Sequence, residues 1–130
     1  MVLVDTHVVI WLALEPERIS KKARTAIEET RRRGDGLAIS DMTLLEIAMI
    51  ANKNRITLNS TLESFLSEVE SRFIVLPISA RICVRALGLP ANFPNDPADR
   101  IIAATALVEG ILLVTADAEI QRSKALRTLW

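Results

Sequence analysis

The stretch Asn95–Val114, NDPADRIIAATALVEGILLV, contains the pattern that decides the fold. Asp96 followed by Pro97 is typical of a helix start, because aspartate caps free backbone N–H groups and proline fits the first helical position. The apolar segment that follows is interrupted at Glu109-Gly110, and ILLV then forms a short, continuous apolar run. This order predicts a helix followed directly by a buried strand.

The same alternation of strand and helix recurs along the whole chain. Apolar strands are predicted at 2–4, 37–39, 73–76, 111–114 and 126–129. Helices are predicted at 20–34, 40–52, 62–69, 82–87 and 97–107, with Ser20 as an N-cap and a helical turn after Asp117. Short, continuously apolar strands between helices are typical of a parallel α/β sheet that is covered on both faces.

Composition limits the class of protein further. The 130 residues are most simply one domain, 1–130, and 16 basic residues balance 16 acidic ones, so any contact with nucleic acid must be local. Cys83 is the single cysteine. It excludes an internal disulfide and a cysteine-based metal cluster, and we expect it to be a small buried hydrophobe. With no signal peptide and no membrane-spanning run, we expect a soluble, cytoplasmic protein without membrane contact.

Five carboxylates follow predicted strands or lie on predicted helices that approach the same edge of the sheet. Asp5 follows VLV directly, and Asp117 follows ILLV in the segment VTAD. Glu46 is the one charge in MTLLEIAMIA, while Asp96 and Asp99 open the helix that precedes ILLV. Because the carboxyl ends of parallel strands meet at one edge of a sheet, we expect several of these acids to converge there.

Most of these acids also have a purely structural explanation. Asp96 can be an N-cap with Asp99 at the third position of a capping box, and Asp117 can cap its own helical turn. Glu46 can form an interior ion pair with Arg100. Asp5 is harder to explain in this way, because burial of an unpaired carboxylate at the end of a strand is costly.

As a set, the acids indicate a hard divalent cation. Oxygen ligands suit Mg²⁺, with Mn²⁺ as a plausible substitute, and a cation relieves the repulsion that clustered carboxylates otherwise experience. Such a site supports metal-assisted hydrolysis of a phosphodiester by an activated water. His7 is more simply structural than a ligand or general base, and Trp11 and Trp130 are most simply core or interface residues.

Four blocks resemble the PIN-domain ribonucleases, most closely the VapC toxins of bacterial and archaeal toxin–antitoxin pairs: LVDTHVVIWL, SDMTLLEIA, NDPADRIIAATAL and LLVTAD. The blocks are in the expected order and span essentially the whole chain. The resemblance implies a three-layer α/β/α sandwich around a mainly parallel sheet of four or five strands. It also implies an Mg²⁺-dependent endoribonuclease that acts on RNA, is inhibited by a cognate VapB-like antitoxin and often forms a homodimer.

The resemblance assigns roles to individual residues by position. Catalytic and metal-binding roles fall to Asp5, Glu46, Asp99 and Asp117, with Asp96 as a possible additional ligand. Small hydroxyls that would hold the carboxylates or metal waters in place are Thr6, Ser40 and Thr115. The candidates for contact with RNA phosphates are Arg100, Arg55 and Lys53. Arg31 to Arg33 are more simply complements of a helix dipole.

Two other functions fit the same residues. A non-catalytic PIN-fold binding or assembly module would keep the acids as caps and ion pairs, and a folded protein that binds no divalent cation would favour it. An aspartate phosphotransfer domain also has a parallel sheet with acids at the strand ends. It fits less well, because the first strand ends in one aspartate, in DTH, rather than in an acidic doublet.

Overall fold

The computed structural model describes residues 1–130 and contains one sheet of five parallel strands in the order β3-β2-β1-β4-β5. The strands are β1 (Val2–Val4), β2 (Leu37–Ser40), β3 (Ile74–Leu76), β4 (Leu112–Val114) and β5 (Thr128–Leu129). The helices are α1 (Thr6–Leu14), α2 (Lys21–Arg32), α3 (Asp41–Asn52), α4 (Leu62–Arg72), α5 (Ala80–Leu87), α6 (Pro97–Glu109) and α7 (Ala118–Ser123), with a 3₁₀ turn η1 (Pro16–Arg18).

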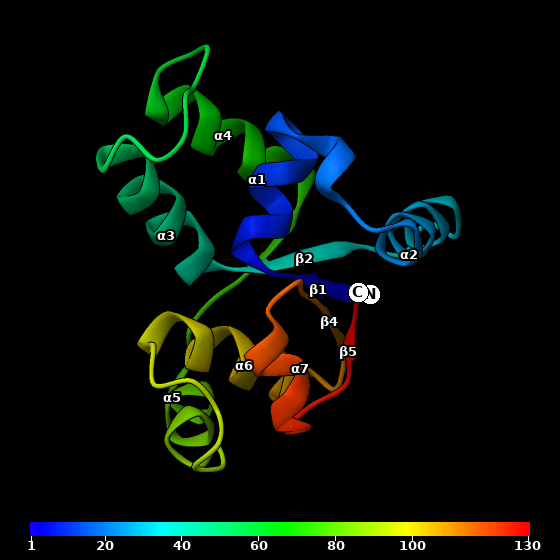
Figure 1. The fold of residues 1–130 in the computed structure, drawn as a ribbon, viewed down its shortest axis with the longest axis vertical. Helices are drawn as coiled ribbons and strands as arrows, with labels where there is room; N and C mark the ends of the chain where they lie inside the picture. The colour runs from blue at the N-terminus through cyan, green and yellow to red at the C-terminus, as the bar shows by residue number, and fades with distance from the viewer.

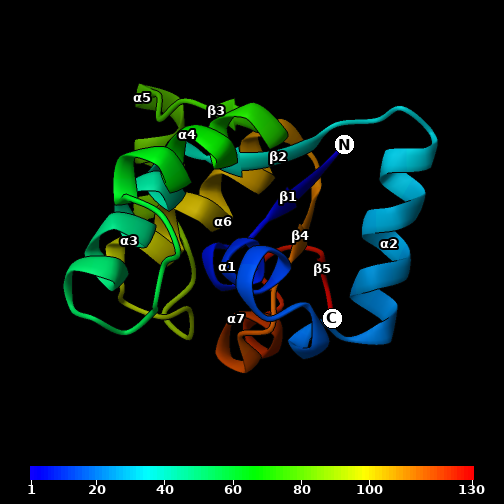
Figure 2. The ribbon, with the colours of Figure 1, turned by 90° about the horizontal axis from the view of Figure 1, so that it is seen from above.

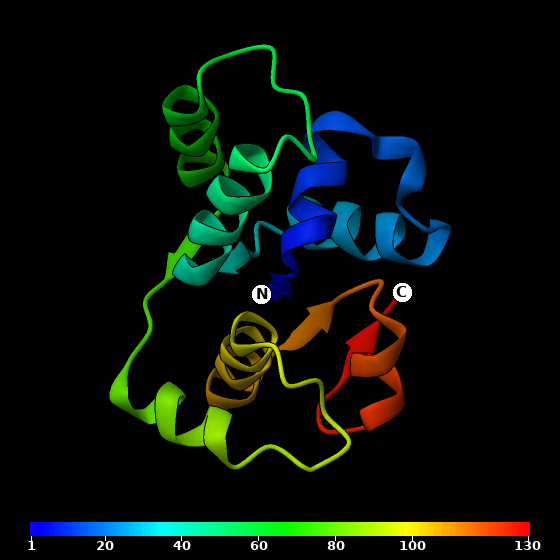
Figure 3. The ribbon, with the colours of Figure 1, turned by 60° about the vertical axis from the view of Figure 1, so that its left-hand side comes forward.

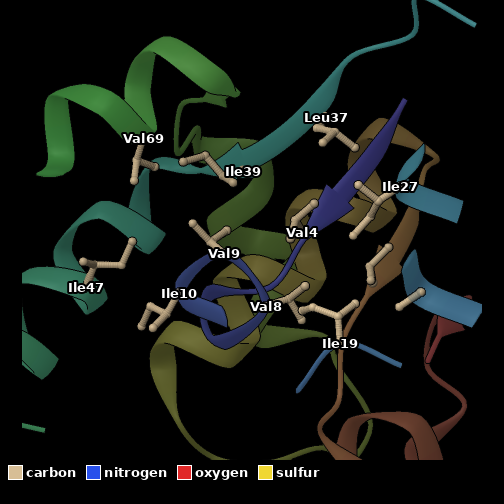
Figure 4. Close-up of a cluster of buried hydrophobic side chains, with 12 residues drawn as sticks. Val4, Val8, Val9, Ile10, Ile19, Ile27, Leu37, Ile39, Ile47 and Val69 are labelled. Carbon is tan, nitrogen blue, oxygen red and sulfur yellow. The ribbon is translucent and has the colours of Figure 1, made fainter. Parts of the chain in front are cut away.

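Helices cover both faces of the sheet, as Figure 1 shows for α1, α3 and α4 on one side and α5, α6 and α7 on the other. Consecutive residues of a strand point to opposite faces. Val4 therefore packs in a cluster with residues of α1 to α4, and Leu3 packs with residues of α6 and α7. Figure 4 shows the first cluster, in which Val4 and Ile39 lie near Val9. The predicted three-layer α/β/α architecture is confirmed.

Helix α1 differs from what the sequence patterns predict, because no helix was expected over residues 6–14. The segment THVVIWLAL is apolar along most of its length and rich in β-branched residues, so no helical periodicity separates a buried face from an exposed one. Val8, Val9 and Ile10 are all buried in the first cluster. Tertiary packing makes this segment helical against its local preference.

The expectation that Cys83 is buried is wrong. Helix α5 packs on α6 through Ile82 and Ala86, which are one turn apart and share one face. Cys83 follows Ile82 by one residue, which turns it by about 100° to the exposed side of the helix.

Most other predicted helices and strands are present, with ends that differ from the prediction by a few residues. Ser20 caps α2 as predicted, because its hydroxyl accepts a hydrogen bond from the Ala23 N–H at 3.1 Å.

The strand order creates a crevice at the middle of the sheet. From β1 the chain runs through β2 to β3 in one direction, then returns across β1 to build β4 and β5 on the other side. Figure 2 shows β1 between β2 and β4. In parallel sheets of this kind, ligands bind beyond the carboxyl ends of the strands where the direction reverses. That point lies between β1 and β4.

Helices α3 and α6 contact each other next to this crevice, although they belong to different layers. Figure 3 shows them approaching each other from the two sides of the sheet. The start of α6 therefore comes close to the inward face of α3. None of the helices combines the length and the apolar character that crossing a membrane requires.

Candidate active site

Asp5 lies directly after β1 and is 7% exposed. Its Oδ1 accepts a hydrogen bond from the Thr6 N–H at 2.8 Å, and its Oδ2 accepts one from the Thr115 hydroxyl at 2.6 Å. Burial raises the pKa of Asp5, and these two hydrogen bonds act in the opposite direction. The carboxylate is therefore held in one orientation by groups that follow β1 and β4.

Glu46 is a half-buried residue of α3 that faces the end of β1. The Thr6 hydroxyl donates to Glu46 Oε1 at 2.5 Å and lies 3.1 Å from the Thr43 hydroxyl. Burial raises the pKa of Glu46, and the charges of Asp5 and Asp96 raise it further. Thr43 was missed by sequence reasoning; the signal is its position three residues before Glu46, on the same helix face.

The start of α6 carries two aspartates with different environments. Asp96 is the predicted N-cap, and its Oδ1 accepts from the N–H groups of Ala98 at 2.8 Å and Asp99 at 3.4 Å. The Asp99 carboxylate accepts no hydrogen bond, so the return contact of a capping box is not formed. Burial, followed by the charges of neighbouring carboxylates, raises the pKa of Asp99 to about 7.

Asp117 is both a cap and a neighbour of the other acids. Its Oδ1 accepts from the N–H groups of Glu119 at 2.9 Å and Ile120 at 3.1 Å, and so begins α7. Its negative charge contributes to the raised pKa values of Asp5 and Asp99. The two interpretations of Asp117, as a cap and as a member of an acidic site, are therefore compatible.

None of these five acids forms an ion pair with a basic side chain, although the charge of His7 acts to lower the pKa of Asp5 and Glu46. The ion pairs of the protein join residues three or four apart within surface segments, and none includes any of the five. The ion pair expected as an alternative for Glu46, with Arg100, is absent. Carboxylates that raise one another's pKa without a compensating cation are the environment that a divalent metal relieves.

The donor set fits Mg²⁺ or Mn²⁺, because it consists of carboxylate oxygens supported by hydroxyls. No group of three or more histidine, cysteine, aspartate or glutamate side chains is arranged so that it could hold a metal ion by itself. Mg²⁺ does not require one, since it usually binds through one or two carboxylates and keeps several waters. Asp99 and Glu46 are the acids with the fewest hydrogen bonds, so their oxygens are the most available to a cation.

Two of the expected supporting hydroxyls touch the acids, and the third does not. Thr115 bonds to Asp5 and also accepts from the Asp117 N–H at 3.1 Å, while Thr6 bonds to Glu46. The Ser40 hydroxyl instead accepts from the Met42 N–H at 3.1 Å and makes no hydrogen bond with a carboxylate. As the N-cap of α3, its oxygen is directed at the helix rather than at the acids.

Removal of the Thr115 hydroxyl is expected to weaken the protein. Thr115→Val keeps the shape of the side chain but leaves Asp5 Oδ2 buried without its partner, which typically costs about 1–3 kcal/mol. Thr115→Ser should retain most of the stability. Urea denaturation of the three proteins measures the difference; equal midpoints for the valine variant and the wild type would show that the bond contributes nothing.

Arg100 is engaged in holding backbone. Its guanidinium donates to the carbonyl oxygens of Pro94 at 3.0 Å, Ala86 at 3.2 Å and Phe93 at 3.5 Å. These bonds join the end of α5 and the loop before α6 to α6 itself. Three of the five guanidinium N–H groups therefore bind backbone carbonyls, which gives Arg100 a structural role. Its contact with RNA phosphate stays a prediction.

Arg100→Ala is therefore expected to destabilise the protein by about 1.5–3 kcal/mol, the usual effect of losing hydrogen bonds to a charged group. Arg100→Lys should restore only part of the lost stability, since the lysine ammonium lacks the planar guanidinium that reaches three carbonyls. Chemical denaturation measures the change. If the alanine variant has wild-type stability but binds RNA more weakly, the main role of Arg100 is to contact the phosphate.

A groove of about 810 Å³ opens from the acidic site, and its walls include Glu46 and Asp96. Lys53 and Arg55, predicted as contacts for RNA, line this groove, as does the exposed side chain of His7.

The two tryptophans and the basic end of α2 contribute to the packing and to the helix ends. Trp11 is partly buried against the first cluster, and its ring centroid lies 5.7 Å from that of Trp130. Arg31 and Arg32 occupy the last turn of α2, where they complement the helix dipole.

Comparison with known proteins agrees with this arrangement. The sequence pattern of the PIN domain matches residues 2–126. The chain belongs to the PIN domain family. Ribonuclease VapC22 of Mycobacterium tuberculosis (strain ATCC 25618 / H37Rv) is 37% identical over 131 residues, which cover 99% of this chain and 98% of that protein. This PIN domain is therefore of the VapC type.

Solved structures show the same fold over almost the whole chain. VapBC2 from Rickettsia felis, bound to a DNA fragment from its promoter, matches with a TM-score of 0.73 and 19% identity, over 99% of this chain and 98% of that one. A toxin–antitoxin complex from Klebsiella pneumoniae matches with a TM-score of 0.65 and 26% identity, over 90% and 87% of the two chains. The all-parallel sheet and its helical layers are thus the PIN fold.

Proposed function

We propose that this PIN domain is an Mg²⁺-dependent endoribonuclease that hydrolyses RNA as a VapC-type toxin. The observation that carries the proposal is the group of carboxylates, none of them in an ion pair, at the crevice between β1 and β4. The relative VapC22 is named as a ribonuclease, and the match covers 99% of this chain and 98% of that protein. The same five acids stand in the four sequence blocks that resemble the family.

When bound, Mg²⁺ supplies positive charge that stabilises a phosphodiester under attack and lowers the pKa of the attacking water. Asp5 and Asp99 would hold the ion, and Asp5 is oriented for this by the Thr115 hydroxyl and the Thr6 N–H. Glu46, which accepts a hydrogen bond from Thr6, would orient the attacking water, and Asp117 would add negative charge. The products would carry 5′-phosphate and 3′-hydroxyl ends.

The test is cleavage of RNA by the purified protein with Mg²⁺ or Mn²⁺ and with EDTA. We expect cleavage with either cation and none with EDTA, and ends that accept ligation as 5′-phosphate and 3′-hydroxyl. Cleavage that continues at full rate in EDTA, or products with 2′,3′-cyclic phosphate, would contradict a metal-dependent mechanism of this kind.

We also propose that a cognate antitoxin binds this protein. The support is the fold shared with chains of VapBC and toxin–antitoxin complexes. An antitoxin segment with a basic side chain would inhibit by entering the acidic site. A small neighbouring reading frame with a DNA-binding N-terminal half, whose product suppresses RNA cleavage when co-purified, is the expected finding.

A homodimer is part of the proposal. Four large apolar side chains are exposed on two helices: Leu45 and Met49 on α3, and Val84 and Leu87 on α5, the last two at 71% and 86%. The two residues of each pair are one helical turn apart, and contiguous exposed apolar patches often mark protein–protein interaction sites. Light scattering should give about twice the 14.4 kDa mass of the chain, and Leu87→Glu should shift it toward the monomer.

The alternative is a non-catalytic PIN-fold binding or assembly module. It is favoured by the N-cap hydrogen bonds of Asp5, Asp96 and Asp117, which give these three acids a structural role. Calorimetry separates the two functions: a folded protein that binds neither Mg²⁺ nor Mn²⁺ would support the module.

A further inference from the structure

Two threonine hydroxyls lie between the start of α1 and the inward face of α3. The Thr43 Oγ1 is 3.1 Å from the Thr6 Oγ1, and the Thr6 hydroxyl donates to Glu46 Oε1 at 2.5 Å. Thr43 is 0% exposed and Thr6 is 1% exposed. The three side chains therefore form one chain of hydrogen bonds that begins in the protein interior and ends on a carboxylate of the candidate site.

This chain of hydrogen bonds has one direction when Glu46 is ionised. A hydroxyl carries one proton and accepts through its lone pairs, whereas an ionised carboxylate only accepts. The proton of Thr6 is used in the bond to Glu46, so the Thr6 oxygen must be the acceptor in its bond with Thr43. Thr43 is therefore the donor at the start of the chain.

The position of Thr43 in α3 explains why its proton is available for this bond. Threonines inside helices commonly donate to the carbonyl four residues earlier. Thr25, Thr30 and Thr105 do so, at 3.0, 2.8 and 2.7 Å. Thr43 is the third residue of α3, so the residue four positions earlier is Ile39 in β2 and belongs to no helix. Thr43 makes no such local bond and donates to α1 instead.

Glu46 is held by the protein at one carboxylate oxygen only. Its Oε1 accepts from Thr6, while its Oε2 makes no hydrogen bond, and the side chain lines the groove that opens from the acidic site. In a chain of hydrogen bonds, each donor is polarised by the donor behind it, which strengthens the next bond. Thr43 therefore strengthens the single bond that fixes the direction of the Glu46 carboxylate.

We propose that Thr43 is a positioning residue of the acidic site: by donating to Thr6, it directs the Thr6 hydroxyl at Glu46 and so holds the Glu46 carboxylate in its working orientation. The inference rests on the proposed ribonuclease function. It adds to the five acids a buried, uncharged residue that acts on one of them through a second side chain.

Steady-state cleavage of RNA with Mg²⁺ tests this proposal on matched variants. Thr43→Val keeps the shape of the side chain and removes the donor, so kcat should fall about 10–100-fold, the effect of removing an outer partner in a metal site. KM for RNA should not change. Thr43→Ser keeps the hydroxyl and should restore kcat. Thr43→Ala removes the same donor with a smaller side chain and takes the place of the valine variant if that protein does not fold.

Thr105→Val is the matched control. Thr105 is also a 0% exposed threonine in a helix, but its hydroxyl donates within α6, to the Ile101 carbonyl. This variant should cleave RNA as the wild type does. A double-mutant cycle separates positioning from packing, because independent effects multiply. If Thr43 acts through Thr6, then Thr6→Val alone and Thr6→Val combined with Thr43→Val should have the same kcat.

The Glu46 carboxyl carbon gives a second measurement that needs neither metal nor RNA. Its ¹³C resonance, assigned with the help of Glu46→Gln and recorded in EDTA, responds to the hydrogen bond that the carboxylate accepts. The resonance should move in Thr43→Val and stay at the wild-type position in Thr43→Ser and Thr105→Val. An unmoved resonance in Thr43→Val would overturn the inference.

The outcomes separate this inference from the proposed function. If the wild type cleaves RNA and Thr43→Val cleaves it as well as Thr105→Val does, the inference is wrong and the ribonuclease stands. If the effects of the Thr6 and Thr43 variants multiply, Thr43 acts through packing and the inference is also overturned. If the wild type cleaves no RNA, the proposed function fails; a moved Glu46 resonance in Thr43→Val would then still support the positioning, and an unmoved one would refute it.

Discussion

Asp5→Asn is expected to abolish RNA cleavage while leaving the protein folded and at least as stable as the wild type. Asparagine caps a helix as well as aspartate does, so the start of α1 is preserved. A neutral amide also avoids the cost of a carboxylate that is 7% exposed. Activity should fall by more than about 100-fold, beyond the roughly 10–100-fold loss seen when outer partners of metal ligands are removed.

The decisive result is a loss of activity without a loss of stability. RNA cleavage with Mg²⁺ and thermal unfolding measure the two quantities on the same preparation. Asp35→Asn is the control, since Asp35 is an exposed aspartate between α2 and β2. It should change neither quantity. Equal cleavage by the Asp5 variant and the wild type would refute the mechanism, and a large loss of stability would mean that the negative charge of Asp5 is itself needed for folding.

The metal-free protein is expected to lose stability as the pH rises from about 4 to above 7. Asp99 has its pKa raised from 3.8 to about 7 in the folded state, and the pKa values of Asp5 and Glu46 are raised as well. The folded protein therefore binds protons that the unfolded chain has already released. Stability falls with pH wherever the folded state holds more protons, so the destabilisation that comes from Asp99 is absent below about pH 4 and complete above about pH 7.

Urea denaturation in EDTA at several pH values measures this dependence. Asp99→Asn should make the profile less steep between about pH 4 and 7, because one of the three groups with a raised pKa no longer ionises. Mg²⁺ should stabilise the wild type more at pH 8 than at pH 5, since a cation binds the ionised carboxylates. A stability that rises over this range, or a variant with the same slope as the wild type, would contradict the burial of Asp99 among acids.

Much of the fold was predictable because local signals and burial agree in most elements. Asp96-Pro97 begins α6 as expected, Ser20 caps α2, and the continuous apolar runs are strands buried on both faces. Helix α1 was not predictable from periodicity, since burial along most of its length removes the contrast between faces. The exposure of Cys83 likewise depends on which side of α5 faces α6.

The sequence by itself determined which residue types are available to the site: two acids that follow strands, three acids in helices or at a helix start, two threonines beside them and no cysteine partner for a metal. Only the tertiary structure decided what each one does. It showed that Asp96 caps α6 while the Asp99 carboxylate accepts no hydrogen bond, and that Ser40 caps α3. It also showed that three donors of Arg100 are bound to carbonyls. The physical reason is that identity and order lie in the chain, whereas orientation, burial and the available partners arise only when distant segments pack together.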